Sequence, residues 1–521
     1  MANVPLLDIR PDHWALVRAI LYAHVPQYEV WAFGSRATWQ AKPYSDLDLA
    51  ILSAEPLPLA LSAALADAFS EADLPWRVDV LDWATTSPSF RAIVQRDKVV
   101  VQKKLTAGYD HGNAMSEWQE TKLGNVIELK RGYDLPQSQR TYGNVPIVSS
   151  SGVSDFHNKA MVKAPGVVTG RYGTIGQVFY IEKDFWPLNT ALYVRDFKTN
   201  DPKFISYLLK TLDFRAYSDK AAVPGVNRNH LHEAKVRIPP LPIQHAIAHI
   251  LGSLDDKIEL NRRMNETLEA MARALFKDWF VEFGPVRAKM EGRQPPGLSA
   301  EIAALFPDAL DTEGKPVGWE MTSFAATINL IGGGTPRTAE PAYWGGEIPW
   351  FSVVDIPRDG DVFTIDTEKK ITERGLSESA TRLLSPGTSI ISARGTVGKC
   401  ALVGVPMAMN QSCYGVIGKE GRGSYFTHFS LRYLVTELQQ NTHGSVFDTI
   451  TQATFQTIHV PTIPIPLTQA FDHTVSSFLQ RILTNLHESH TLAALRDLLL
   501  PKLLSGELRV RDAEGVIAGA R

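Results

Sequence analysis

Three acidic residues and a glycine–serine turn near the N-terminus have the types and spacing of a site for a divalent metal ion and a triphosphate. Asp46 and Asp48 lie two apart in an apolar run, and Asp79 lies in a later one. Residues two apart in a strand share a face, so the first pair of carboxylates points the same way. Such carboxylates suit Mg²⁺ on a triphosphate, and all three are candidate catalytic and metal-binding residues. Gly34-Ser35, at a predicted strand-to-helix turn, offers backbone N–H groups and a hydroxyl to phosphates.

A second set of candidates could contact DNA, because Arg can grip guanine and Asn can grip adenine through paired hydrogen bonds. The candidates are Arg131, Arg171, Tyr172, Arg228, Arg337 and Arg394, with Asn189, Asn227 and Asn410 beside them. Each has an ordinary alternative. Turn or capping roles are favoured for Asn189 and Asn410, because both recur in a repeat and base readout should differ between copies. Arg131 and Arg337 could equally be solvated charges or phosphate contacts.

These DNA candidates lie in a sequence repeat that begins near residue 118. The run that begins at Trp118 matches the run at Trp319, and Gly-Arg-Tyr-Gly-Thr-Ile-Gly (170–176) matches Ser-Ala-Arg-Gly-Thr-Val-Gly (392–398). Short β-branched runs between Gly and Pro predict strands in both copies. The second glycine of each motif suits a turn with positive φ. We therefore expect Arg171, Tyr172 and Arg394 at exposed hairpin tips.

A third block of the repeat predicts two long helices. Apolar residues or Asn recur at alternating steps of four and three from 247 to 275, which is a heptad pattern, and the block recurs 224 residues later. Pro242 and Pro466 stand just before the expected helices. Asn485 is in register with Asn261, so a polar pair would fix the register of an antiparallel pairing. The alternative is two independent amphipathic helices packed on their own domains.

Composition limits the possible classes of protein. The 521 residues, 44% of them hydrophobic, exceed one core and predict three or four globular domains. No apolar run reaches the length of a membrane span, and the first residues lack a secretory pattern. Only Cys400 and Cys413 occur, which fits a reducing cytoplasm and argues against disulfides or zinc. The net charge of −3 does not by itself indicate a nucleic-acid binder.

From residue 116 to about 510 the chain resembles the specificity subunit of type I restriction–modification enzymes. Several ordered motifs carry the resemblance: Phe-Val-Glu-Phe-Gly-Pro-Val-Arg-Ala-Lys (280–289), Leu-Phe-Pro-Asp (305–308), Gly-Gly-Thr-Pro-Arg (333–337), Tyr-Trp-Gly-Gly-Glu-Ile-Pro-Trp (343–350) and Leu-Leu-Ser-Gly-Glu-Leu (503–508). The resemblance implies two β-rich target-recognition domains that each read half of a split site in double-stranded DNA. It also implies a helical spacer that carries two methyltransferase subunits, with restriction and translocase subunits in the complex.

Methyl transfer and cleavage would belong to those partners, which use S-adenosylmethionine and ATP. The sequence contains neither the Asn/Asp-Pro-Pro-Tyr/Phe motif of adenine methyltransferases nor a Gly-x-x-x-x-Gly-Lys-Ser/Thr phosphate loop. A helix of about thirty residues would separate the two domains by about 45 Å, more than one turn of DNA. A fixed gap between the half-sites follows from this geometry.

Residues 8–103 resemble the minimal nucleotidyltransferase family. The match assigns metal to Asp46, Asp48 and Asp79 and phosphates to Gly34 and Ser35, with Arg36 as a further phosphate contact. The resemblance implies transfer of a nucleotide, often AMP from ATP, to an acceptor with the help of two Mg²⁺ ions. Members are often antitoxins that modify a partner toxin. The structural alternative, two acidic residues at a strand end, is disfavoured because the glycine–serine turn and the third aspartate occur with them.

The expected fold is α+β and multidomain. It comprises a nucleotidyltransferase-like domain (1–104), a linker (105–117), the first recognition domain (118–239), a helix with connector (240–318), the second recognition domain (319–463), a second helix (464–510) and a tail (511–521). The two helices are expected to pair as an antiparallel coiled coil. Met115 could be a relic of gene fusion or an internal start. Two functional alternatives stand beside the DNA-specificity interpretation: a nucleotidyltransferase whose target the repeats choose, and a scaffold that has lost DNA binding.

Overall fold

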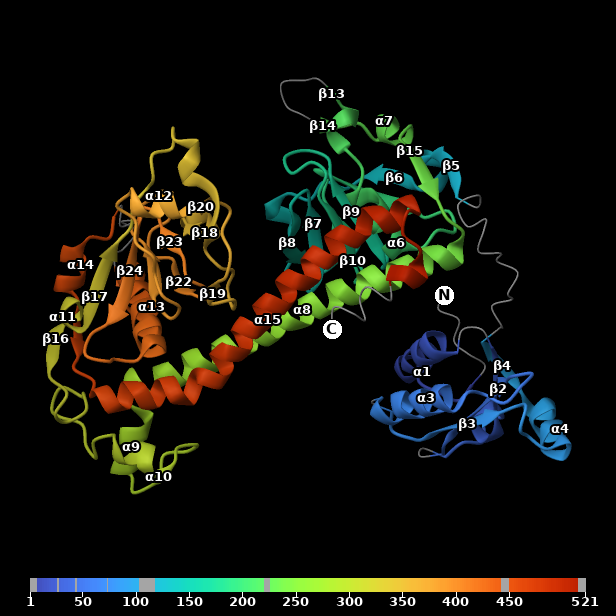
Figure 1. Cartoon of the computed structure of the whole chain (residues 1–521), viewed down its shortest axis with the longest axis horizontal. Coiled ribbons are helices and arrows are strands. Elements are labelled where there is room, and N and C mark those ends of the chain that lie inside the picture. The colour runs from blue at the N-terminus through green and yellow to red at the C-terminus, as the bar shows by residue number, and fades with distance from the viewer. Residues whose placement is uncertain are drawn as a thin grey trace. The chain divides into compact units, whose positions relative to one another are not determined.

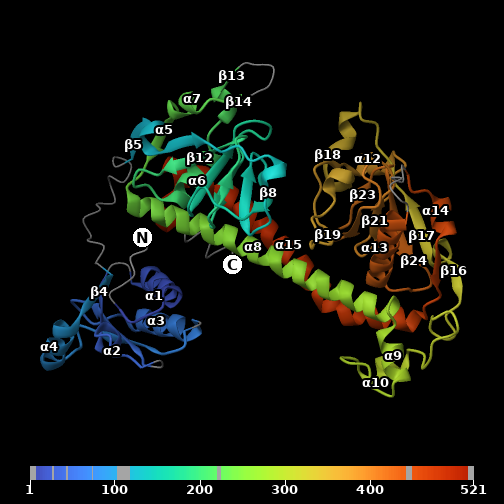
Figure 2. The same ribbon diagram turned by 180° about the vertical axis from the view of Figure 1, so that it is seen from behind.

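The computed structural model describes residues 7–25, 28–42, 45–72, 74–102, 118–219, 225–441 and 449–513. The chain divides into two compact units, Met1–Gln119 and Glu120–Arg521. They are called unit 1 and unit 2 below, and each is described by itself (Figures 1 and 2). The expected linker and Met115 lie outside the described residues. No helix among those residues is long and apolar enough to cross a membrane.

Unit 1 is a four-stranded sheet with helices on its two faces. Its elements are α1 (Pro11–His24), β1 (Glu29–Phe33), α2 (Gly34–Ala37), β2 (Leu47–Leu52), α3 (Leu59–Glu71), β3 (Val78–Asp82), α4 (Pro88–Asp97) and β4 (Val99–Gln102). The strand order is β3-β2-β1-β4, with β2 and β3 parallel and the other neighbours antiparallel. Alternate strand residues, such as Leu47, Leu49 and Ile51, pack against α1 and α3 in the main core. A smaller cluster around Trp31, Ala50 and Val94 joins the other face to α4.

The first repeat of unit 2 is β-rich and leads into a long helix. Its elements are β5 (Gln119–Lys122), α5 (Leu123–Val126), β6 (Glu128–Arg131), η1 (Gln137–Gln139), β7 (Val145–Ser149), β8 (Gly152–His157), β9 (Gly166–Gly170), β10 (Val178–Ile181), β11 (Trp186–Pro187), β12 (Ala191–Asp196), α6 (Pro202–Lys210), η2 (Phe214–Tyr217), β13 (Ser218–Asp219), β14 (Gly225–Val226), α7 (Arg228–His232), β15 (Lys235–Ile238) and α8 (Leu241–Phe280). The main sheet has the order β10-β9-β12-β6, and a smaller one has the order β11-β7-β8.

The second repeat follows a connector that contains α9 (Gly284–Met290) and α10 (Ala300–Ala304). Its elements are β16 (Met321–Ser323), α11 (Phe324–Thr327), β17 (Ile328–Gly332), η3 (Pro341–Tyr343), β18 (Trp344–Phe351), η4 (Val353–Asp355), β19 (Phe363–Thr364), β20 (Lys370–Ile371), α12 (Glu373–Ser377), β21 (Ser389–Ser392), β22 (Cys400–Val403), β23 (Ala408–Met409), β24 (Cys413–Gly418), α13 (Ser424–Asn441), α14 (Gln452–Thr457), β25 (His459–Pro461) and α15 (Ile465–Ser505). Its main sheet, β17-β24-β21-β22-β19, repeats the topology of the first with one added strand.

The two long helices are longer than the sequence analysis assumed. α8 has 40 residues and α15 has 41, so each rises about 60 Å rather than about 45 Å. Pro242 and Pro466 do not precede the helices as expected but lie in their first turns, since α8 begins at Leu241 and α15 at Ile465. Proline is tolerated there because the first backbone N–H groups have no partner within the helix.

Candidate functional sites

The acidic residues of unit 1 lie on neighbouring strands of its sheet. Asp48 in β2 and Asp79 in β3 are partners in the parallel register, which places their side chains on the same face. Asp46 precedes β2 by one residue and shares this face by alternation. Burial raises the pKa of Asp48, and the negative charges of Asp79 and Asp46 raise it further. Negative charge accumulates here, and a divalent cation would relieve it.

Gly34 forms the turn that faces these carboxylates. Its φ is +75°, a conformation that L-residues with side chains rarely adopt, and a Cβ at this position would collide with Asp48 Oδ2. Phe33, the residue before it, pairs with Asp48 across β1 and β2. Ser35 follows in the short helix α2. The chain therefore brings Gly34 beside Asp48, with Ser35 next along the chain.

Arg36 is a buried residue, which the sequence analysis did not anticipate. Its side chain is 6% exposed, with Nε donating to the carbonyl of Ser45 at 2.8 Å and Nη1 to that of Asp8 at 2.8 Å. The guanidinium also lies 4.4 Å from the ring centroid of Trp76. These contacts hold the segment that leads into Asp46. They favour a positioning role for Arg36 over the expected contact with phosphate.

The acidic residues are not drawn around a common point. Within the described residues, no group of three or more His, Cys, Asp or Glu side chains is arranged to hold a metal ion. Asp79 instead lies near Arg77, with 3.6 Å between Oδ1 and Nε, and both side chains are largely exposed. Their exposure means that Asp79 can change rotamer without disturbing the core. Ligation by all three carboxylates would require that change.

In the first repeat, several of the DNA candidates gather at one end of the main sheet. Arg171 and Tyr172 follow β9, and their backbone N–H groups donate to the carbonyl of Thr190, just before β12. Arg131 ends β6 beside Asp134, with 3.9 Å between the charged groups. Asn189 donates to the same Asp134. Gly173 and Gly176 have φ of +75° and +85°, so the expected turn conformation of the hairpin glycines is confirmed.

Arg228 belongs to the same end of the first repeat. Tyr172 forms a β-bridge with Gly225, and the carbonyl of Arg171 accepts from Val226 N at 3.0 Å. Arg228 begins the neighbouring α7 and is exposed. Asn227 is the N-cap of α7, because its side chain accepts from Asn229 N at 3.0 Å. Arg171, Tyr172 and Arg228 thus share a surface, whereas Asn227 has a capping contact.

The second repeat presents different side chains at the equivalent end of its sheet. Arg394 follows β21, is exposed, and bridges to Thr449 as Tyr172 bridges to Gly225. Asn410 accepts from Ser412 N at 3.0 Å, which is the turn role that the sequence analysis favoured. Arg337 lies in the segment after β17 and has an exposed side chain, while its carbonyl accepts from Trp344 Nε1 at 3.2 Å. A common scaffold therefore carries different side chains at matching places.

α8 and α15 are joined through polar residues at the middle of their contact. Asn261 Nδ2 donates to Ser489 Oγ at 3.2 Å and to Glu488 Oε2 at 2.8 Å, while Asn485 Nδ2 donates to Asn265 Oδ1 at 2.9 Å. Because residue numbers fall along α15 as they rise along α8, the two helices are antiparallel. The asparagines are at most 1% exposed. Asn261 Nδ2 also donates to the carbonyl of Asn485, its counterpart in the repeat, at 3.4 Å, so the two asparagines meet at the contact, with Glu488 and Ser489 as further partners of Asn261.

Buried and half-buried charged side chains attach the β-rich domains to these helices. Asp255 on α8 accepts from Tyr207 of the first domain at 2.6 Å and from Arg496 of α15 at 2.7 Å. Glu269 on α8, 4% exposed, accepts from Arg432 of the second domain at 2.9 Å. Sequence reasoning missed these residues. The sequence contained one indication of Glu269: it lies four positions after Asn265, so it faces the same side of the helix as the heptad positions.

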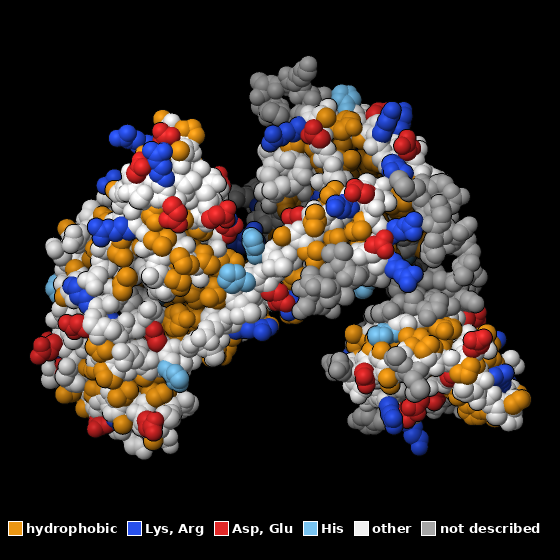
Figure 3. Space-filling view, in the orientation of Figure 1, with side chains coloured by type: hydrophobic (Ala, Val, Ile, Leu, Met, Phe, Trp, Pro, Cys, Tyr) orange, Lys and Arg blue, Asp and Glu red, His pale blue; other side chains and the backbone are white. Residues whose placement is uncertain are grey.

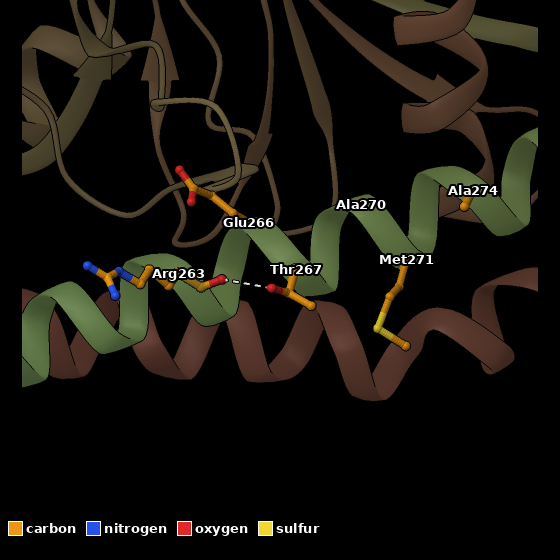
Figure 4. Close-up of a pocket in the computed structure, with 6 residues that line it drawn as sticks. All are labelled: Arg263, Glu266, Thr267, Ala270, Met271 and Ala274. Atoms are coloured by element: carbon orange, nitrogen blue, oxygen red, sulfur yellow. Dashed lines mark hydrogen bonds between the residues drawn. The ribbon is translucent and has the colours of Figure 1, made fainter. Parts of the chain in front are cut away.

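An exposed face of α8, between residues 263 and 274, carries a pocket of about 610 Å³ (Figure 4). Six exposed residues spaced three or four apart line it: Arg263, Glu266, Thr267, Ala270, Met271 and Ala274. Met271 is 45% exposed. The spacing places all six on one stripe of the helix.

Comparison with known proteins identifies the family. The model of the type I restriction modification DNA specificity domain matches residues 115–270 and 316–496, and that of the polymerase beta nucleotidyltransferase domain matches residues 20–106. The chain belongs to the type I DNA-specificity family and carries a nucleotidyltransferase-family unit at its N-terminus.

Individual relatives divide in the same way. The type I restriction enzyme HindI specificity subunit of Haemophilus influenzae is 26% identical over 76% of this chain and all of its own length. The MjaIX specificity subunit of Methanocaldococcus jannaschii is 24% identical over 77% of this chain and 96% of its own. The probable protein adenylyltransferase MntA of Haemophilus influenzae is 56% identical over 20% of this chain and 91% of its own. A solved S subunit from M. genitalium covers 77% of this chain and 98% of its own, at 17% identity and a TM-score of 0.49.

Proposed function

We propose that residues 118–510 act as the DNA-specificity subunit of a type I restriction–modification complex. Residues 118–239 and 319–463 would each read one half of a bipartite site in double-stranded DNA. The observation that carries the proposal is the duplicated sheet end, where the same scaffold presents Arg171 and Tyr172 in one copy and Arg394 in the other. Sharing a scaffold while varying its side chains is what two readers of different half-sites require.

In this proposal, α8 and α15 form an antiparallel coiled-coil spacer. Buried polar pairs such as Asn485 and Asn265 would fix its register, because a shift along the seam would leave amide groups without partners. The pocket on α8 offers exposed apolar area around Met271 to which a methyltransferase subunit could bind. Two such subunits, with restriction and translocase subunits, would perform the chemistry on DNA.

Methylome sequencing of cells that carry this chain and its methyltransferase tests the proposal. We expect a split motif with one methylated adenine in each half and a fixed gap. Arg394→Ala should relax the second half-site alone, whereas Arg171→Ala should relax the first, by about 1–3 kcal/mol for a lost bidentate base contact. A continuous motif, or loss spread equally over both halves, would contradict the assignment of one reader to each half.

We propose a second activity for unit 1: transfer of AMP from ATP to an acceptor hydroxyl. The juxtaposition of Asp46, Asp48 and Asp79 with the Gly34 turn supports it. The acceptor oxygen would bond to the α-phosphorus as the bond to the β-phosphate oxygen breaks. Pyrophosphate leaves, and the hydroxyl proton passes to a carboxylate of this group or to water. Mg²⁺ held by these carboxylates would neutralise charge on the phosphates.

Incubation of the full chain with ATP labelled at the α-phosphate tests this activity. We expect label on an acceptor that depends on Mg²⁺ and is lost with Asp46→Asn or Asp48→Asn. Both substitutions keep the size of the side chain and remove its negative charge. Labelling that persists in both variants would exclude these carboxylates as the catalytic group.

A further inference from the structure

The two faces of the sheet in unit 1 are covered unequally. One face is packed against α1 and α3. The other carries Trp31, Phe33, Ala50 and Leu52, with α4 packed against only part of it. By alternation along β2, Asp48 shares this second face with Ala50 and Leu52. The carboxylates and the partly covered apolar surface therefore lie on the same side of the sheet.

Exposed apolar side chains continue outward from the carboxylates. The backbone of Phe33 pairs with that of Asp48. The ring of Phe33 makes an edge-to-face contact with the ring of Phe90 in α4, with 6.1 Å between the ring centroids. Phe90 is 40% exposed, and Ile93, three residues further along α4, is 48% exposed. Val100, opposite Trp31 in β4, is 45% exposed. We call Phe33, Phe90, Ile93 and Val100 the α4 strip; hydrophobic side chains are visible on the surface in this part of unit 1 (Figure 3).

The charges beside the α4 strip argue for a protein partner over a nucleic acid. Arg91 donates to the carbonyls of Trp83 and Ala84 at 2.6 and 3.1 Å, and its guanidinium lies over the Trp83 ring. Arg96 is paired with Asp97 at 2.7 Å, and Lys98 Nζ lies 3.6 Å from the centroid of the Trp31 ring. Binding of a phosphate backbone needs clustered cations that are available to it. These three cations already have partners within unit 1.

We propose that the α4 strip is the docking surface for the acceptor protein of unit 1. The inference rests on the proposed AMP transfer, takes the acceptor to be a protein as the name of the MntA relative indicates, and adds the place where that protein binds. The partner would cover Phe90, Ile93 and Val100 with apolar side chains of its own. Because the α4 strip begins at Phe33, beside Asp48, a partner seated on it would bring a Ser, Thr or Tyr hydroxyl to the carboxylates.

The test compares three substitutions in the full chain. Phe90→Glu and Ile93→Glu place a charge on the α4 strip. Leu16→Glu is the matched control, because Leu16 is also 40% exposed but lies on α1, against the opposite face of the sheet. The probe is ATP labelled at the α-phosphate, with Mg²⁺ and an extract of the source cells. The protein labelled by the unaltered chain is identified by mass spectrometry, purified, and used as acceptor in kinetic assays.

We expect Phe90→Glu and Ile93→Glu each to raise KM for the purified acceptor at least tenfold. KM for ATP and binding of a non-hydrolysable ATP analogue should stay unchanged, and Leu16→Glu should match the unaltered chain. Equal labelling by all variants would overturn the docking surface while leaving AMP transfer in place. Label on nucleic acid, on a small molecule or on this chain alone would overturn the acceptor class. If the unaltered chain transfers no label to anything, the proposed AMP transfer itself fails, and the docking proposal fails with it.

Discussion

Lengthening the two long helices should lengthen the gap in the recognised DNA by an amount set by helix geometry. Towards its middle, α8 is joined to the first β-rich domain at Asp256, which accepts a hydrogen bond from Lys203 at 3.1 Å. Its first contact with the second domain is at Asn265, which binds Asp361 at 3.2 Å. Residues inserted between these two points move the domains apart and leave both hydrogen bonds in place, whereas the contact of His490 on α15 with Asp366 of the second domain, 3.6 Å, would be lost.

The insertion site follows from the antiparallel pairing. Whole heptads placed between Asn261 and Asn265 in α8, and between Asn485 and Ser489 in α15, keep the apolar seam continuous. Seven residues add about 10 Å, or about three base pairs, which turns the second half-site by about a third of a DNA turn. Twenty-one residues add about 31 Å, close to the roughly 34 Å of a full turn.

Methylome sequencing with each insertion variant measures the result. The 21-residue variant should modify a motif with unchanged half-sites and a gap longer by about nine or ten base pairs. The 7-residue variant should modify poorly, because its second domain meets the wrong side of the duplex. The helical-spacer reasoning is refuted if a 21-residue variant that still binds its methyltransferase keeps the original gap. Equal modification by the two variants would refute it as well.

Five further outcomes are expected. Asn485→Leu removes the donor to buried Asn265 and should lower local stability by about 1–3 kcal/mol, seen as faster amide exchange along α8. The double variant with Leu at both 265 and 485 should recover part of this loss. Unchanged amide exchange in Asn485→Leu would contradict the pairing. Asp48→Asn should reduce AMP transfer by more than about 100-fold. Because the pKa of metal-free Asp48 is raised, protons should compete with Mg²⁺, and the Mg²⁺ concentration that the unaltered chain needs for transfer should rise on acidification from a higher pH than an ordinary aspartate would give. Because the pKa of Asp48 is raised in the folded state, its ionised carboxylate lowers the stability of the fold above the ordinary aspartate pKa. Without divalent cations, Asp48→Asn should therefore raise the melting temperature of unit 1 near neutral pH. Gly34→Ala should abolish binding of ATP analogues, whereas Gln40→Ala, at an exposed position after α2, should retain it.

The sequence predicted the features that depend on local spacing. The two-residue step from Asp46 to Asp48, the paired glycines of each hairpin and the heptad of α8 are periodic, and backbone geometry converts each period into a face or a turn. The repeat offset of 224 predicted that Asn485 occupies the same position of the heptad in its helix as Asn261 does in the first helix. The duplication alone also indicated two domains of one fold with different exposed side chains.

Tertiary structure decided which groups meet across long sequence separations. The sequence suggested that Arg36 contacts phosphate, yet its guanidinium is buried and donates hydrogen bonds to the carbonyls of Asp8 and Ser45. Asn261 contacts Glu488 and Ser489 as well as Asn485, its counterpart in the repeat, because antiparallel packing brings the next turn of α15 within reach. Glu269 pairs with Arg432 from a separate domain. Periodicity fixes the direction in which a side chain points along its own element, but the residue it meets there depends on how elements far apart in the chain pack together.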